Sequence, residues 1–170
     1  MEKLLITETQ NTWKNELSSE HNIDYTYLQD LLKAEQWKEA DRETLAVMLK
    51  AADREKQGWF NNESIDNFPC NDLRTINQLW IQNSNRRFGF SVQKRIWESV
   101  GRDYEKFGEQ VGWRKGMLTK QWLYYREITF NINAPLGHLP TFMAPNISSC
   151  WGPFARLVLR PLGFFSREDL

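Results

Sequence analysis

Along most of the chain, apolar side chains recur three and four residues apart. This spacing places them on one face of an α-helix, whereas a half-buried strand would need strict alternation. The first such face is carried by Leu28, Leu31 and Leu32. It predicts a helix over about 25–35, with Asp24 as the N-cap residue. The chain is therefore expected to fold mainly into helices.

Three further helical faces follow. The second is expected to be the longest helix, with Gly58 as its C-terminal cap. The third is expected to begin with Asn71 or Asp72 as N-cap, and the fourth to run from Ser91 to a cap at Gly101. The apolar positions that mark these three faces are Trp37, Ala40, Thr44, Val47, Met48, Ala51, Leu73, Ile76, Leu79, Trp80, Val92, Ile96 and Val100.

After a short amphipathic piece at 104–107, the helical spacing gives way to glycines and clustered rings. We expect a long structured loop over 112–130, in which Ile128 and Phe130 favour a short extended run. A turn rich in proline and glycine follows at 134–140. These features predict that irregular backbone, not a further long helix, follows the fourth helix.

The domain organisation is expected to be simple, since no linker or internal repeat interrupts the chain. Residues 1–22 are polar and weakly periodic, and we expect a poorly ordered leader. Residues 23–165 are expected to form one compact all-α domain. Its last element is a short helix that ends before Pro161 and carries Arg156 and Arg160 four residues apart on one face.

Charge and cysteine content narrow the possible functions. The 22 basic and 22 acidic side chains cancel, so no net field attracts nucleic acid or an anionic surface. Two cysteines are too few for a disulfide framework or a zinc knuckle, which indicates a reducing compartment. No apolar run approaches the ~18 residues of a transmembrane helix, and no signal peptide is recognisable.

Catalytic and metal-binding motifs are not recognisable in the sequence. Only two histidines are present, His21 and His138, and there is no phosphate-binding loop. His138 is a possible axial ligand for the metal of a porphyrin. Next to glycine and two prolines, however, a turn histidine bonded to the backbone is favoured. We therefore expect neither a catalytic residue nor a tightly bound metal.

Aromatic and basic residues gather in the loop over 112–130, and the chain holds eight tryptophans, more than a core of this size needs. Rings beside Arg and Lys suit a flat, apolar ligand with carboxylate arms. For Trp113 and Phe130 core packing is the favoured reading, and for Tyr124 and Tyr125 both readings stay open. Basic pairs beside rings also suit single-stranded nucleic acid, but the neutral net charge disfavours that reading.

The run DLRTINQLW, followed in order by RFGFSVQ and GHLP, resembles the genomes-uncoupled-four family over about residues 24–140. The resemblance implies an all-helical domain of the genomes-uncoupled-four type, shaped like a cupped hand, with loops as fingers. It also implies a porphyrin ligand, protoporphyrin IX or Mg-protoporphyrin IX, and stimulation of magnesium chelatase through its porphyrin-binding large subunit. A stand-alone tetrapyrrole or bilin sensor is the alternative.

The resemblance also places the finger loop on 112–130 and matches the family's aromatic position for chelatase stimulation to Tyr124, or to Tyr125 if a gap shifts by one. The implied protein is a non-catalytic monomer of the cytoplasm or plastid stroma that does not bind nucleic acid. Peripheral association with photosynthetic membranes is left open. The expected porphyrin-binding residues are Trp59, Phe88, Trp122, Tyr124, Tyr125, Arg126, Phe142, Arg156 and Arg160.

Overall fold

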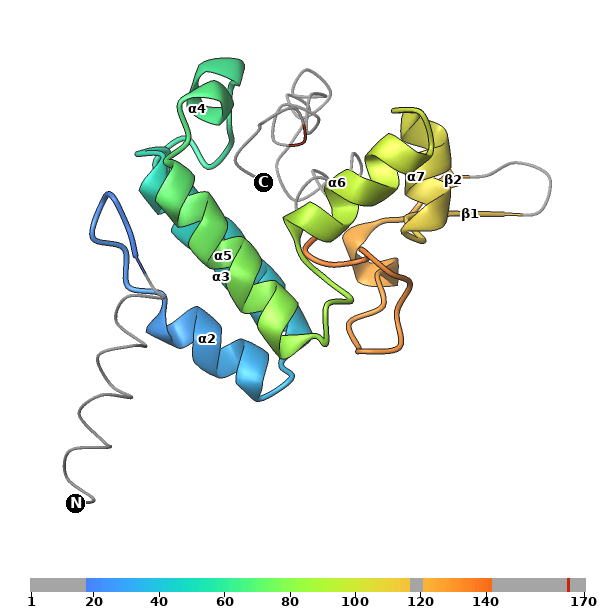
Figure 1. Ribbon diagram of the computed structural model, residues 1–170, viewed down its shortest axis with the longest axis horizontal. Coiled ribbons are helices and arrows are strands. Elements are labelled where there is room, and N and C mark those ends of the chain that lie inside the picture. Colours follow the sequence, from blue (N-terminus) through green and yellow to red (C-terminus); the bar gives the residue numbers. More distant parts are fainter. Residues whose placement is uncertain (1–17, 117–120, 142–164, 166–170) are drawn as a thin grey trace.

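The computed structural model describes residues 18–116, 121–141 and 165 (Figure 1). Within these residues the protein is mainly helical, which confirms the expected fold class. A two-residue antiparallel ladder and a 3₁₀ turn follow the helices. The elements are α2 (Thr26–Lys33), α3 (Trp37–Ala51), α4 (Asn62–Asp66), α5 (Cys70–Asn83), α6 (Phe90–Ser99), α7 (Tyr104–Gln110), β1 (Arg114–Lys115), β2 (Gln121–Trp122) and η1 (Tyr125–Glu127).

Helices α3 and α5 lie side by side, and α2 packs against both of them (Figure 1). The first predicted helix is confirmed, because Leu28, Leu31 and Leu32 are the buried residues of α2. Its N-cap residue is Tyr25 and not Asp24, although the carboxylate of Asp24 accepts a hydrogen bond from the amide of Thr26 at 2.9 Å. The indole of Trp80 lies at the centre of this bundle, where Nε1 donates to Thr44 Oγ1 at 2.9 Å. This hydrogen bond satisfies the indole N–H inside the apolar core.

α3 is the longest helix of the described residues, as predicted, but it ends at Ala51 and not at a Gly58 cap. Asp53 adopts a left-handed backbone with φ of 52°, and the amide of Arg54 donates to the carbonyl of Leu49. Gly58 instead ends the turn that follows α3. The apolar face stops at Ala51 and charged residues follow it, so a longer helix would have no surface to bury.

The expected N-cap of α5 is also wrong. The helix begins at Cys70, with Pro69 at the N-cap position, and Asp72 lies within the first turn. It accepts hydrogen bonds from Ser19 Oγ at 2.5 Å, from the amide of Glu20 at 2.9 Å and from the hydroxyl of Tyr25 at 2.5 Å. These hydrogen bonds hold the segment that leads into α2 against α5. Ser19 and Glu20, which we had assigned to the leader, are part of that segment.

The Gly101 cap of α6 is confirmed. The amide of Gly101 donates to the carbonyl of Glu98, and the amide of Arg102 donates to that of Trp97, the paired bonds of a Schellman motif. α7 then extends to Gln110, beyond the predicted 104–107. α4 and the β1–β2 ladder were not predicted, and the segment expected to be extended contains no strand: η1 and turns surround Ile128.

Candidate functional site

The turn at 134–140 is fixed against the start of α6. Two side chains, those of Arg87 and the buried Gln93, each donate two hydrogen bonds to carbonyl oxygens of this part of the chain. The amide of Gly89 also donates to the carbonyl of Leu139 at 3.0 Å. The turn is therefore a rigid wall beside α6. The acceptors of the side-chain bonds are Ile132, Ala134, Gly137 and Pro140, at 2.8–2.9 Å.

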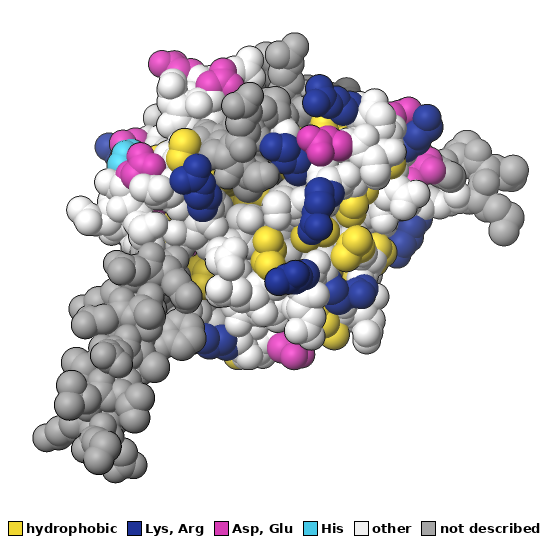
Figure 2. Space-filling view, viewed as in Figure 1, with side chains coloured by type: hydrophobic (Ala, Val, Ile, Leu, Met, Phe, Trp, Pro, Cys, Tyr) yellow, Lys and Arg dark blue, Asp and Glu magenta, His cyan; other side chains and the backbone are white. Residues whose placement is uncertain are grey.

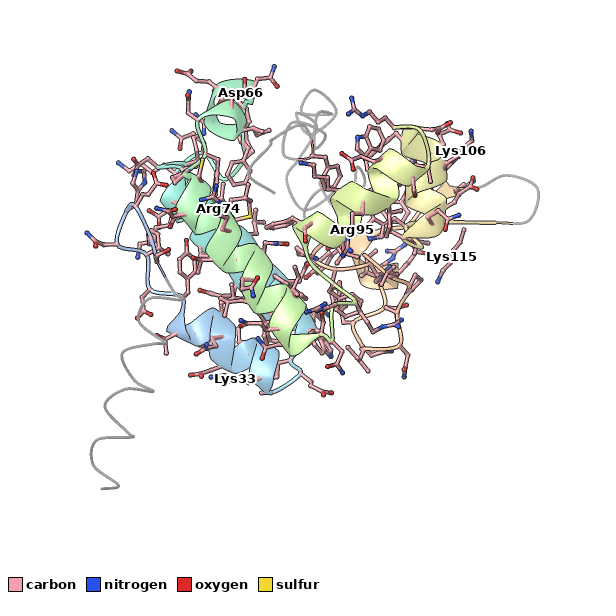
Figure 3. The ribbon with its side chains drawn as sticks, viewed as in Figure 1. Lys33, Asp66, Arg74, Arg95, Lys106 and Lys115 are labelled. Atoms are coloured by element: carbon pink, nitrogen blue, oxygen red, sulfur yellow. The ribbon has the colours of Figure 1, made fainter. Side chains whose placement is uncertain are left out.

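A hollow of about 360 Å³ lies where this turn meets α6. Its apolar part comes from Val92, Ile96 and Leu136, and its two cations are Arg86 and Arg95. Figure 3 shows Arg95 on α6 where that helix faces α5, and Figure 2 shows hydrophobic side chains among Lys and Arg on the same face. An apolar floor flanked by guanidinium groups suits an apolar ligand that carries carboxylates.

The backbone at the rim of this hollow is strained. Asn85 and Arg86 follow α5 in the left-handed region, with φ of 51° and 61°. The amide of Arg86 donates to the carbonyl of Ile81 at 2.9 Å, which closes α5 without a glycine. Asparagine adopts this conformation readily, whereas for Arg86 it costs about 1–2 kcal/mol. Arg86 is one of the residues that line the hollow.

Gly137 lies against Ile96, one of the residues that line the hollow. Its backbone is left-handed, with φ of 71°, and a Cβ there would lie 2.8 Å from Cδ1 of Ile96. Only glycine meets both conditions without a shift of Ile96.

The loop over 112–130 is closed at its base by His138, which is 1% exposed. Nδ1 lies 2.6 Å from the carbonyl of Val111, and Nε2 accepts from the amide of Thr129 at 3.1 Å. Burial lowers the pKa of His138, against the opposing effect of the hydrogen bond to Val111. The structure confirms a turn histidine bonded to the backbone. Both ring nitrogens are occupied, so neither is free to bind a porphyrin metal.

Trp113 packs in the core, which confirms the favoured reading. It is 1% exposed, and its Nε1 donates to the carbonyl of His138 at 2.8 Å. Trp122 is half-buried, and its ring stacks on Tyr104 with centroids 4.6 Å apart. Gly108 allows this approach, because a Cβ there would lie 2.4 Å from Cη2 of Trp122. Trp122 therefore packs β2 against α7 and leaves only part of its surface to a ligand.

The two adjacent tyrosines lie in different surroundings. Tyr124 is 48% exposed, and the guanidinium of Arg126 lies 5.2 Å from its ring centroid. Tyr125 is half-buried, with Arg42 of α3 at 5.9 Å and the ring of Phe130 at 5.2 Å. Phe130 itself packs against the core, as the favoured reading had it. Tyr124 is thus available to a ligand or partner, whereas Tyr125 attaches η1 to α3.

A buried carboxylate lies beneath Tyr125. Asp41 of α3 accepts from the amide of Thr141 at 2.6 Å and from its Oγ1 at 2.8 Å, a contact between residues 100 positions apart. Burial raises the pKa of Asp41 to about 6, although the bonds from Thr141 oppose that shift. These two bonds fix the chain just after Pro140 against α3.

The other expected site residues are not gathered at one place. Trp59 is 45% exposed and stacks on Arg54 at 4.8 Å, near a second hollow of about 260 Å³ beside α4. Phe88 is fully buried against Trp37 and Trp80, so it has no surface to offer a ligand, and we leave it out of the site. The expected residues that lie outside the described part of the chain are Phe142, Arg156 and Arg160.

Sequence reasoning missed the residues that line the hollow. Val92 and Ile96 were interpreted as part of a helix face. Arg95 forms, with Lys94, one of the basic pairs that were weighed only as a possible nucleic-acid site. The signal was present, because Arg95 lies one position before Ile96 and three after Val92, on the edge of that face. Leu136, 48% exposed within the turn, comes from a distant part of the chain.

Metal and membrane sites were also sought. In the described residues no three His, Cys, Asp or Glu side chains gather where they would hold a metal ion. Over the same residues no helix combines the length and apolar character that crossing a bilayer requires.

Comparison with known proteins places the chain in a family. The model of the GUN4-like family matches residues 18–152. A Ycf53-like protein of Synechocystis sp. is 36% identical over 127 residues, which cover 73% of this chain and 53% of that protein. A chloroplastic tetrapyrrole-binding protein of Arabidopsis thaliana is 34% identical over 125 residues, 68% of this chain and 47% of that protein. The chain spans about half the length of these curated relatives.

Solved structures agree with the sequence matches. The structure of GUN4 from Chlamydomonas reinhardtii superposes with a TM-score of 0.65 and 37% identity, over 73% of this chain and 84% of that one. The ligand-free structure of Arabidopsis thaliana GUN4 gives a TM-score of 0.64 and 28% identity, over 86% and 98% of the two chains. By its sequence and by its fold, this chain belongs to the GUN4-like family.

Proposed function

We propose that this protein binds a tetrapyrrole and is a regulator, not a catalyst, of magnesium insertion into porphyrin. The observation that carries the proposal is the hollow on α6, where an apolar floor lies between the guanidinium groups of Arg86 and Arg95. Membership of the GUN4-like family and the similarity to a relative named as a tetrapyrrole-binding protein support it.

The chemistry of the hollow matches one edge of a porphyrin. The macrocycle is flat and apolar and would lie against Val92, Ile96 and Leu136, while its propionates would pair with the two arginines. Burial of an apolar edge of the macrocycle favours binding by ~25 cal/mol per Å² of apolar surface, from which the cost of association is subtracted. No bond from the protein to a metal is part of this proposal, in keeping with the occupied nitrogens of His138.

The size of the hollow bears on what the protein does with its ligand. At about 360 Å³ and open to solvent, it accepts one edge of a macrocycle and leaves the remainder exposed. An exposed ligand can be passed to another protein. We propose protoporphyrin IX or Mg-protoporphyrin IX as the ligand and the porphyrin-binding large subunit of magnesium chelatase as the partner, in the plastid stroma or the cyanobacterial cytoplasm.

The chelatase rate with and without this protein tests the regulatory part of the proposal. With limiting protoporphyrin, we expect the rate of magnesium insertion to rise several-fold when the protein is added. A protein that binds porphyrin but leaves the rate unchanged at saturating concentration would be a stand-alone sensor, and the chelatase part of the proposal would be wrong.

A further inference from the structure

Leu136 brings the turn at 134–140 into the hollow on α6. The turn passes beside α6 (Figure 1). Of the described residues that line the hollow, the other five come from the stretch 86–99, which leads into α6 and forms it. Leu136 is 48% exposed, so core packing does not fix its place. Its position depends instead on the backbone that follows and precedes it.

Gly137, the residue after Leu136, is held through both of its backbone polar groups. Its amide donates to the carbonyl of Arg87 at 2.8 Å, and its carbonyl accepts from Nε2 of Gln93 at 2.9 Å. Both partners lie in the stretch 86–99 that forms the rest of the hollow. The wall that the turn contributes is therefore attached directly to the floor that α6 contributes.

The side-chain amide of Gln93 is committed to the turn. Its Nε2 also donates to the carbonyl of Pro140 at 2.8 Å, so the nitrogen bonds two carbonyl oxygens. Because carbonyl oxygens only accept, the nitrogen and not the oxygen of the amide must lie on this side. Oε1 is buried and has no hydrogen-bond partner among the described residues. The hydrogen bonds of this amide within the described part of the chain thus go to the turn alone.

Arg87 holds a different part of the same turn. Its guanidinium donates to the carbonyls of Ile132 and Ala134, which precede Leu136. Gln93 is the side chain that holds the part of the turn after Leu136, and it comes from α6 itself. The distance between Leu136 and the floor of the hollow is therefore most directly under the control of Gln93.

We propose that Gln93 is the positioning residue of the tetrapyrrole site: its amide keeps Leu136 in place against the edge of the macrocycle that enters the hollow. This rests on the proposed function, since it takes the ligand of the hollow to be a porphyrin. Gln93 is fully buried and is not among the residues that line the hollow, so it acts through Leu136. A site loses affinity when a wall is displaced, even where every group that contacts the ligand is retained.

A double-mutant cycle tests whether Gln93 acts through Leu136. Gln93→Met removes the donors and keeps the length of the side chain, and Leu136→Ala removes the wall itself. We expect each single variant to bind protoporphyrin about fivefold more weakly than the wild type, and the double variant also about fivefold. Independent effects would multiply to about 25-fold, and that result would overturn the proposal.

Thr44→Val is the matched control for lost stability. It breaks another buried hydrogen bond, the one from Trp80 Nε1, between residues of α3 and α5 that do not line the hollow. Urea denaturation measures the stability of each variant, and fluorescence titration measures its porphyrin affinity. We expect Thr44→Val to lose stability but to bind porphyrin within about twofold of the wild type. If it binds as weakly as Gln93→Met, general destabilisation explains the loss and the proposal is wrong.

Gln93→Glu takes the place of Gln93→Met in the cycle if the latter does not fold. Its side chain has nearly the same shape and donates at most one hydrogen bond, and only while it is protonated. We expect it to bind porphyrin at least about twofold more weakly than the wild type, again without a further loss when Leu136→Ala is added. Wild-type affinity in Gln93→Glu would overturn the proposal.

Amide hydrogen exchange separates this proposal from the proposed function. In the absence of ligand, we expect the amide of Gly137 to exchange at least about tenfold faster in Gln93→Met or Gln93→Glu than in the wild type and in Thr44→Val. If the wild type does not bind porphyrin, the proposed function is wrong, while faster exchange still supports the hold of Gln93 on the turn. Unchanged exchange at Gly137 would overturn the positioning role, whether or not porphyrin binds.

Discussion

The Nδ1 atom of His138 lies 2.6 Å from the carbonyl oxygen of Val111, the residue just before the loop over 112–130. Through Nε2 the same ring accepts the amide of Thr129, the residue at the other end of the loop. One imidazole thus joins the two ends of the segment that presents Trp122 and Tyr124. The position of these rings therefore depends on a side chain that contacts neither of them through its ring nitrogens.

Replacing His138 with Ala is expected to destabilise the fold. The carbonyl of Val111 and the amide of Thr129 would each lose a buried partner, at about 1–3 kcal/mol apiece. Urea denaturation measures the free energy of unfolding. A loss below about 0.5 kcal/mol, the level of an ordinary surface change, would show that the loop does not depend on this ring.

The same histidine makes stability depend on pH. Because its pKa is lowered in the fold, the folded protein holds the neutral ring and the unfolded chain binds a proton first. Its contribution is fully present above the unfolded pKa of about 6.5 and is lost as pH falls below that value. In urea denaturation the destabilising effect of His138→Ala should therefore shrink as pH falls below about 6.5, and an effect that is constant from pH 8 to 5 would contradict this.

Asp41 should make stability depend on pH in the opposite direction to His138. Burial raises its pKa to about 6, so ionisation of Asp41 is more costly in the folded protein than in the unfolded chain. Its stabilising contribution is greatest below the unfolded pKa of about 3.9 and declines as pH rises through 6. Relative to Asp41→Asn, which cannot ionise, the wild type should lose stability between pH 4 and 6. If the wild type instead gained stability relative to Asp41→Asn between pH 4 and 6, the raised pKa of Asp41 would be wrong.

Two glycines with nearly the same backbone provide a matched test of the hollow. Gly137 and Gly101 have φ of 71° and 72°, but a Cβ would strike Ile96 only at Gly137, and at Gly101 it meets nothing within 4 Å. Both Gly→Ala changes should cost about 1–2 kcal/mol of stability for the left-handed backbone. Only Gly137→Ala should weaken porphyrin binding, as measured by fluorescence titration. If the two variants bound porphyrin with equal affinity, the ligand would lie outside this hollow.

Tyr124 and Tyr125 should separate into two roles. Tyr124→Ala removes an exposed ring, and we expect lower chelatase stimulation with stability within about 0.5 kcal/mol of the wild type. Tyr125→Ala removes a half-buried ring that packs on Phe130, and we expect a loss of unfolding free energy. Thermal denaturation and the chelatase rate distinguish the two. If Tyr124→Ala stimulates normally, the exposed ring has no part in coupling.

The sequence predicted the helices well because each carries its own apolar face. Leu28, Leu31 and Leu32 determine one side of α2 without reference to the rest of the chain. The role of Asp72 was not predictable in this way, since the same residue type caps helices and also accepts bonds from Ser19, 53 positions away. Whether Asp72 would cap α5 or fasten the start of the chain was decided by packing that no local pattern encodes.

The site was predicted less well for a related reason. Aromatic residues were taken as candidates for the wall of a ligand site, but Phe88 is buried in the core. The type of ring alone does not distinguish a core residue from a residue that contacts a ligand. The hollow instead joins Arg95 of α6 with Leu136 of a distant turn. That contact depends on the hydrogen bonds of Arg87 and Gln93, which link parts of the chain more than 40 residues apart.

The most direct test of the central claim is a porphyrin titration of the wild type and of the Arg86→Ala, Arg95→Ala variant. Lys50→Ala with Lys56→Ala serves as a control that also removes two charges. We expect protoporphyrin to quench tryptophan fluorescence of the wild type with a Kd of roughly a micromolar or below, about −8 kcal/mol. The arginine variant should bind about tenfold more weakly, and the control should bind normally. Equal binding by all three proteins, or no quenching at tens of micromolar protein, would contradict a tetrapyrrole site on α6.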